Sequence, residues 1–207
     1  MNYVIDRLVQ KYMEEGHNYE TDINQFRISE IKYCPRLMYY LKVYNEVLDT
    51  RLLRIFTIGH IIHKEIQNII KEEEQVEIEK EVIRRFTVKD NSIEIIGHAD
   101  IVRYNEVVDI KTCYKLPDNP YIDHLLQVNT YSYLLNKEYC SVLYVQKNDL
   151  EVRYFQYKTD KNLFEYCLNN CFYVYNCIKN DVLPEKRQYD FCKLCRFKKL
   201  CGGVNEE

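Results

Sequence analysis

Two short runs of β-forming residues, each associated with an aspartate, constrain the fold of this chain more than any other feature. Residues 93–96 lead into Asp100, and the second run, residues 107–111, contains Asp109 and Lys111. Because side chains alternate between the two faces of a strand, Asp109 and Lys111 share one face. If the two runs pair through the turn between them, Asp100 comes close to that same face. The pattern therefore predicts two carboxylates and one ammonium gathered on a β-hairpin.

Two acidic oxygens beside a positive group suit a hard divalent metal and the hydrolysis of a phosphodiester. A structural interpretation is available as well. An aspartate at a strand end is often a turn former, and an Asp-x-Lys pair is often a solvated edge pair. Such a short motif is common by chance, so the remaining sequence has to decide between the two.

Helical patterns flank the β-runs on both sides. Residues 52–74 repeat isoleucine at helical spacing, and His63 borders that apolar stripe, four residues after Gly59. The imidazole could be a metal ligand or an ordinary core residue. Residues 122–136 form the second helical pattern, in which Gln127 and Tyr131 are one turn apart and project from one face. They could contact DNA or simply lie on the helix surface.

The order of these motifs resembles the RecB-type branch of the PD-(D/E)xK nuclease superfamily. The matching residues are Gly59 to His63, Gly97 to Asp100, Asp109 to Lys111, and Gln127 to Tyr131. The resemblance implies a restriction-endonuclease-like fold and a Mg²⁺ or Mn²⁺ site, for which imidazole favours Mn²⁺. It implies that the metal ligands are His63, Asp100, Asp109 and the Ile110 carbonyl. By the same resemblance, Lys111 positions the attacking water, and Gln127 and Tyr131 orient their helix and touch DNA.

The first residue of the Asp-x-Lys motif departs from the pattern of that branch. Its members usually carry Glu there, whereas this chain has Asp109. The shorter side chain would place the metal slightly nearer the strand.

A second group of residues has the spacing of metal ligands. Cys192, Cys195 and Cys201 lie close together near the end of the chain, and Cys34 precedes Pro35 far upstream. Thiolates at such spacing bind zinc or an iron–sulfur cluster. The other five cysteines have no ligand spacing and are expected to be buried as small apolar residues; they are Cys113, Cys140, Cys167, Cys171 and Cys177.

An upstream cysteine joined to a C-terminal cysteine triad resembles the Cas4 family of CRISPR-associated exonucleases, including virus-encoded relatives. That resemblance implies a [4Fe–4S] cluster on Cys34, Cys192, Cys195 and Cys201. It implies exonucleolytic digestion of single-stranded DNA or DNA ends, with room for endonucleolytic cuts. It also allows a homo-oligomer, and CRISPR proteins or viral replication and recombination proteins as partners.

These observations predict an α/β protein with a mixed central sheet flanked by helices. We expect one nuclease domain over residues 1–207, with a nuclease core at about 52–180 and a helical cluster lobe from 1–50 and 184–207. Strands are expected at 76–88, 93–96, 101–104, 107–111, 142–146 and 152–157. Helices are expected within 1–50 and at 52–74, 122–136 and 160–179, the last with Asp160 as its N-cap.

Composition narrows the classes of function. The formal net charge of −3 is unexpected for a protein that binds nucleic acid, although a bound metal would offset part of the local negative field. No apolar run approaches the length of a membrane span, and the first residues do not have the pattern of a signal peptide. Nine cysteines without a secretory signal favour a cytoplasmic metal-binding protein over a disulfide framework.

Two other classes of function are considered. A non-catalytic iron–sulfur DNA-binding or adaptor protein would keep the cysteines and lose the chemistry, but the set of His63, Asp100, Asp109 and Lys111 is intact. An electron-transfer protein would use the cluster and leave the carboxylates unexplained.

Overall fold

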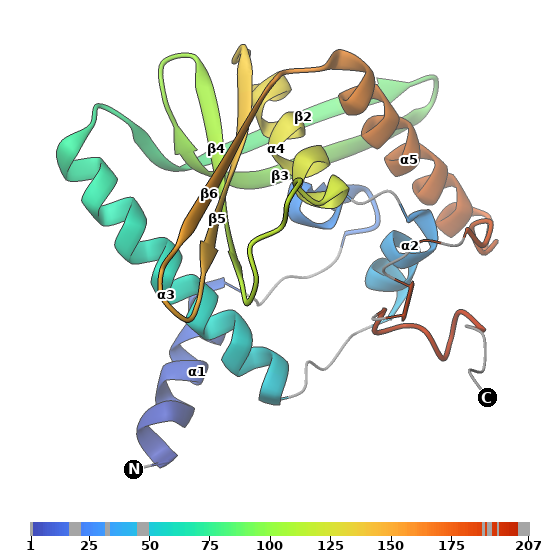
Figure 1. Cartoon of the computed structure of the whole chain (residues 1–207). Coiled ribbons are helices and arrows are strands. Elements are labelled where there is room, and N and C mark those ends of the chain that lie inside the picture. Colours follow the sequence, from blue (N-terminus) through green and yellow to red (C-terminus); the bar gives the residue numbers. More distant parts are fainter. Residues whose placement is uncertain are drawn as a thin grey trace.

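A six-stranded mixed sheet forms the centre of the structure (Figure 1). The computed structural model describes residues 2–16, 22–31, 34–44, 50–187, 189, 192–193 and 195–202. The strands follow the order β1-β3-β4-β5-β6, and β2 pairs with β3. Their bounds are β1 Gln25–Arg27, β2 Glu77–Val88, β3 Asn91–Val102, β4 Glu106–Cys113, β5 Tyr139–Gln146 and β6 Val152–Lys158.

The predicted hairpin is confirmed. β3 and β4 run antiparallel, with Ile101 opposite Val108 and Val102 opposite Val107. β4 then pairs in parallel with β5, and helix α4 (Ile122–Leu134) makes the connection between them. β5 and β6 close the sheet as an antiparallel pair.

Strand β3 differs from the prediction in an informative way. The sequence predicted separate strands at 93–96 and 101–104, but one continuous strand runs from Asn91 to Val102. It pairs with β2 along most of its length. On its other side, residues 94–96 pair with β1 and residues 101–102 pair with β4. Residues 97–100, the Gly-His-Ala-Asp motif, therefore lie in the gap between β1 and β4.

Helices cover both faces of the sheet. Helix α3 (Thr50–Glu73) lays Ile62, Ile66 and Ile70 against one face, where they meet the inward side chains of Ile101 and Val108. Helices α4 and α5 (Lys161–Lys179) pack on the other face, together with the larger core. All three helices were predicted to within about two residues, and the Asp160 side chain accepts a hydrogen bond from the Asn162 amide as the expected N-cap.

The first 50 residues contain more than the expected helices. Helix α1 (Asn2–Gly16) is followed by β1, by a short 3₁₀ helix (η1, Ile28–Glu30) and by helix α2 (Pro35–Val43). Three residues in β1 are too few to show a periodic pattern, so this strand was not predicted.

Helix α2 contacts the C-terminal segment of the chain. This helix packs on α5, and its Arg36 Nε donates to the Pro184 carbonyl at 2.9 Å while the Tyr40 hydroxyl donates to the Leu200 carbonyl at 3.3 Å. Helix α1 lies instead beside α3, and β1 joins the sheet (Figure 1). Only part of residues 1–50 therefore belongs with the C-terminal segment. None of the helices in the described ranges is long and apolar enough to cross a membrane.

Candidate functional site

The candidate site lies at the gap where β3 and β4 diverge. Beyond the pair formed by Ile101 and Val108, the Asp100 side chain replaces the next strand partner, since its Oδ2 accepts a hydrogen bond from the Ile110 amide at 2.7 Å. One carboxylate thus ties the two strands together where their backbones no longer pair. This arrangement holds Asp100 beside the β4 segment that carries Asp109 and Lys111.

Asp109 and Lys111 share a face, as the two-residue spacing predicted. The Lys111 Nζ lies 2.9 Å from the Asp109 Oδ2. Gln127, on α4, bridges the pair: its Nε2 donates to the Asp109 Oδ1 at 3.0 Å, and its Oε1 accepts from the Lys111 Nζ at 3.1 Å. Both ends of the Gln127 amide are therefore engaged within the protein.

His63 reaches the same site from α3. Its Nδ1 lies 3.6 Å from the Asp100 Oδ2. Burial lowers the pKa of His63 to about 4, and the attraction of Asp109 only partly opposes this shift. The imidazole is consequently neutral at neutral pH, the form in which histidine binds metals.

Burial dominates the ionisation of the two aspartates. It raises the pKa of Asp100 to about 6, although the Lys111 ammonium and the Ile110 amide favour the charged form. Burial likewise raises the pKa of Asp109 to about 6 against the effect of Lys111. Burial also acts to lower the pKa of Lys111, but the two aspartates outweigh it and raise that pKa. Lys111 therefore keeps its proton at neutral pH.

Tyr131 has a packing role. It is only 3% exposed, so its side chain packs inside the protein, and its predicted contact with DNA stays a prediction. Its hydroxyl accepts a hydrogen bond from the His98 amide, and a Cβ at Gly97 would lie 2.5 Å from that hydroxyl. Burial raises the pKa of Tyr131 well above its ordinary value. The glycine of one motif is thus required by the tyrosine of another.

Two polar residues of the site were not predicted. Gln67, one helical turn after His63, is 5% exposed, and its Nε2 donates to the Glu79 Oε1 at 2.6 Å and to the Asp100 carbonyl at 3.1 Å. Glu79, the third residue of β2, has a φ of 50°, and it contributes to the electrostatic field at His63 and Asp100. The four-residue spacing from His63 to Gln67 is the sequence signal that could have placed Gln67 on the same helix face as His63.

The donors present suit a divalent cation. Among the residues that the structure describes, no three His, Cys, Asp or Glu side chains already converge as metal ligands. However, the Asp109 Oδ2 is buried and accepts no hydrogen bond of adequate geometry, even though the Lys111 Nζ is near. The two carboxylates are the hard donors that Mg²⁺ and Mn²⁺ prefer, and the neutral imidazole favours Mn²⁺ of the two.

Among the described residues, the four predicted cluster ligands do not form a group of three or more side chains placed to hold a metal, although they influence one another electrostatically. Burial raises the pKa of the Cys34 thiol, with smaller contributions from Cys192 and Cys195. Burial raises that of Cys195 too, with contributions from Cys192 and Cys201. Two N–H groups point at these sulfurs: the Tyr189 amide donates to the Cys192 Sγ at 3.3 Å, and an Arg36 nitrogen lies 3.9 Å from the Cys201 Sγ.

Comparison with solved structures identifies the fold. The crystal structure of SSO0001 superposes with a TM-score of 0.71 at 20% identity, covering 96% of each chain. LHK-Exo, an alkaline exonuclease from Laribacter hongkongensis, matches with a TM-score of 0.52 at 12% identity over 77% of this chain and 90% of its own. Its complex with dAMP matches with a TM-score of 0.53. The chain shares its fold with these proteins.

Sequence comparison agrees with this fold. The chain shows weak homology to the CRISPR-associated exonuclease Cas4 of Saccharolobus solfataricus, with 24% identity over 205 residues, which is 96% of this chain and 97% of that protein. No family model matches the chain.

Proposed function

We propose that this protein is a metal-dependent DNA nuclease. The observation that carries the proposal is that two contacting pairs, His63 with Asp100 and Asp109 with Lys111, lie at one gap in the sheet, where the Ile110 amide joins them. The fold shared with SSO0001 and LHK-Exo and the weak homology to Cas4 support it. A merely structural aspartate pair gives no reason to bury the Asp109 Oδ2 without a hydrogen bond of adequate geometry.

The metal would be held by the His63 imidazole, the two aspartates and the Ile110 carbonyl. When bound, a divalent ion polarises the phosphodiester and lowers the pKa of a coordinated water. The protein prepares this site by keeping His63 neutral and by clamping Asp100 with the Ile110 amide. Gln67 and Gln127 fix the flanking backbone and side chains, as outer partners of metal ligands commonly do.

Lys111 acts as a cation in this mechanism. Its ammonium would orient water and stabilise the negative charge that develops on the phosphate. Its position is set by contacts of 2.9 Å to Asp109 and 3.1 Å to Gln127.

Single-stranded DNA and free DNA ends are the proposed substrate class, and Cys34, Cys192, Cys195 and Cys201 are the proposed ligands of a [4Fe–4S] cluster. The mutual electrostatic influence of these thiols and the N–H groups aimed at two sulfurs support the cluster. Its role would be to fasten α2 to the C-terminal segment, because coordination free energy also stabilises the fold.

The test compares cleavage by the wild type and by the Asp109→Ala and Lys111→Ala variants. The substrates are a linear single strand, its duplex and a covalently closed circle, each with Mn²⁺, Mg²⁺ or EDTA. We expect the wild type to cut the linear single strand fastest and to stop in EDTA. Each variant should lose at least about 100-fold in rate, the scale on which removing one electrostatic group costs catalysis.

Lys89→Ala and Asp90→Ala are matched controls, since both residues are exposed in the turn between β2 and β3. These controls should retain wild-type rates. Wild-type protein that binds DNA but releases no nucleotide under any metal would refute the nuclease and leave a DNA-binding adaptor. Full activity in Asp109→Ala would remove the carboxylate from the mechanism.

A further inference from the structure

The loop between β4 and α4 presents two exposed tyrosines beside the site. Tyr114 is 63% exposed and Tyr121 is 53% exposed. The loop begins just after the strand that carries Lys111 and ends where the helix that carries Gln127 begins. Large aromatic side chains that remain open to solvent next to reacting groups are candidates for contact with a ligand.

Tyr121 is held in a defined position by a buried support. Its amide donates to the Tyr144 hydroxyl at 3.0 Å, and that hydroxyl also lies 2.8 Å from the His124 Nδ1. The Tyr121 ring meets the rings of His124 and Tyr144 edge-on, at interplanar angles of 88° and 74°. Tyr144 is fully buried. The ring is therefore fixed in orientation without being stacked face to face on either neighbour.

This support is continuous with the proposed catalytic groups. Tyr144 is the strand partner of Lys111 between β5 and β4. His124 precedes Gln127 by three residues on α4, which is about 4.5 Å along a helix axis. Tyr121 itself precedes Gln127 by six residues, so a ligand on Tyr121 would lie about 9 Å along the helix axis from the amide that holds Asp109 and Lys111.

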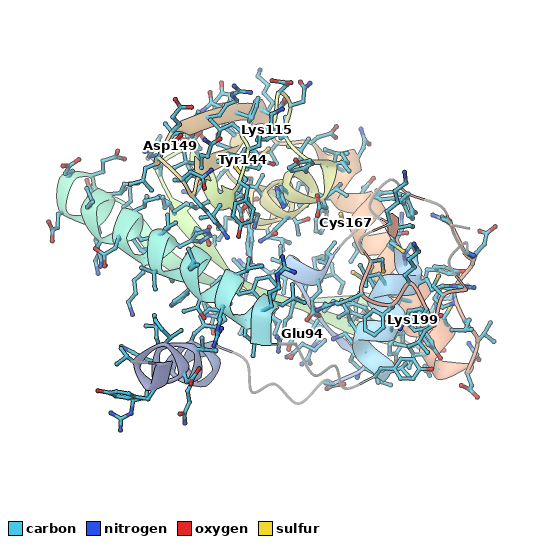
Figure 2. The ribbon with its side chains drawn as sticks, turned by 60° about the horizontal axis from the view of Figure 1, so that its bottom comes forward. Glu94, Lys115, Tyr144, Asp149, Cys167 and Lys199 are labelled. Atoms are coloured by element: carbon cyan, nitrogen blue, oxygen red, sulfur yellow. The ribbon has the colours of Figure 1, made fainter. Side chains whose placement is uncertain are left out.

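The rest of the loop is anchored too. Arg153 Nη1 donates to the Pro117 carbonyl at 2.7 Å, and the Leu116 amide donates to the Gln146 side chain at 3.2 Å. The Lys147 Nζ lies 5.4 Å from the centre of the Tyr114 ring. In Figure 2, Lys115 and Tyr144 lie over the same end of the sheet, far from the lobe marked by Lys199.

Charge indicates which part of a nucleotide would meet Tyr121. Asp123 lies in the first turn of α4, where it disfavours a phosphate at the helix N-terminus. An aromatic ring, by contrast, accepts the flat face of any base. Bases inside a duplex are already stacked on both faces, so away from duplex ends an unpaired base is the one that can offer that face.

We propose that Tyr121, braced by Tyr144 and His124, stacks on an unpaired base of the DNA strand next to the scissile phosphate, with Tyr114 as a second platform. This inference rests on the proposed function and gives a physical source for its preference for single strands. The phosphate backbone would pass toward Lys111, and the base would turn toward α4.

The test measures binding in EDTA, where no cleavage occurs. The probe is a single-stranded oligonucleotide carrying 2-aminopurine, whose fluorescence falls when it stacks, scanned along the strand from its end. We expect Tyr121→Leu to weaken binding by about 10- to 100-fold, the usual value of one base stacked on an aromatic side chain, and to abolish quenching at one position. Tyr121→Phe should behave as the wild type, and duplex binding should not change.

Tyr104→Leu is the matched control, because Tyr104 is 96% exposed at the opposite end of β4, in the turn from β3. Thermal unfolding of each variant checks that it folds. The proposal would be overturned if Tyr121→Leu bound the oligonucleotide as tightly as the wild type. It would also be overturned if Tyr104→Leu and Tyr121→Phe lost as much binding as Tyr121→Leu. If quenching depends on Tyr121 but the wild type cuts no DNA with any metal, the stacking site stands and the nuclease does not.

Discussion

Substituting Gly97 by alanine tests whether two of the motifs are bound together by packing. A Cβ at this position would lie 2.5 Å from the Tyr131 hydroxyl and 3.1 and 3.2 Å from two ring carbons. Tyr131 is 3% exposed and is hydrogen-bonded to the His98 amide, so the ring has little room to withdraw. Overpacking of this kind costs about 2 kcal/mol, which corresponds to about 4–8 °C in Tm for a chain of this size.

The double variant separates packing from other effects. Tyr131→Phe alone loses one hydrogen bond and should cost about 1 kcal/mol. In Gly97→Ala/Tyr131→Phe the shortest contact is gone, so the two losses should fall short of additivity by at least about 1 kcal/mol. Urea unfolding of the four proteins measures this coupling. Additive losses, or a Gly97→Ala variant as stable as the wild type, would refute the reasoning.

Two further predictions concern stability and the cysteines. Burial acts to raise the pKa of Glu106, but hydrogen bonds from Ser141, Tyr154 and Gln156 outweigh burial and lower that pKa. The ionised carboxylate therefore stabilises the fold fully above its unfolded-state pKa. This stabilisation is lost as the pH falls through the lower pKa of the folded state. Glu106→Gln should therefore cost about 2 kcal/mol at pH 7 and progressively less below about pH 4, as followed by urea unfolding; a pH-independent difference would contradict this. Cys34→Ser should lose the iron of the proposed cluster, whereas Cys113→Ser, which lies outside the lobe, should keep it. Metal analysis and visible absorption of anaerobically purified protein measure the iron. Zinc instead of iron in the wild type would show that the cysteines form a zinc site and not an iron–sulfur cluster.

Much of the site followed from local pattern. The two-residue period of a strand placed Asp109 and Lys111 on one face, and the helical period placed His63 and Gln127 on helices that pack beside them. These patterns are strong because each element buries one face, which makes its periodicity visible in the sequence.

The features that escaped prediction depend on contacts between distant segments. Residues 97–100 interrupt the apolar alternation, yet they stay in β3 because β2 pairs along that strand. Glu79 looks like one of several exposed charges in β2 until its left-handed φ and the Gln67 contact are known. Tyr131 looked like a surface residue because nothing local shows that Gly97 leaves space for its hydroxyl.

The contacts of α4 have a consequence for how such a chain can vary. One face of this helix contacts β4 through Gln127 and β3 through Tyr131. The four-residue separation of these two side chains therefore has to match the spacing of the two strands. Insertion of a single residue between them would rotate one of the two side chains by about 100° around the helix axis and break its contact. Length changes should accordingly be confined to the segment before Ile122, where substrate contacts can be retuned without disturbing the chemistry.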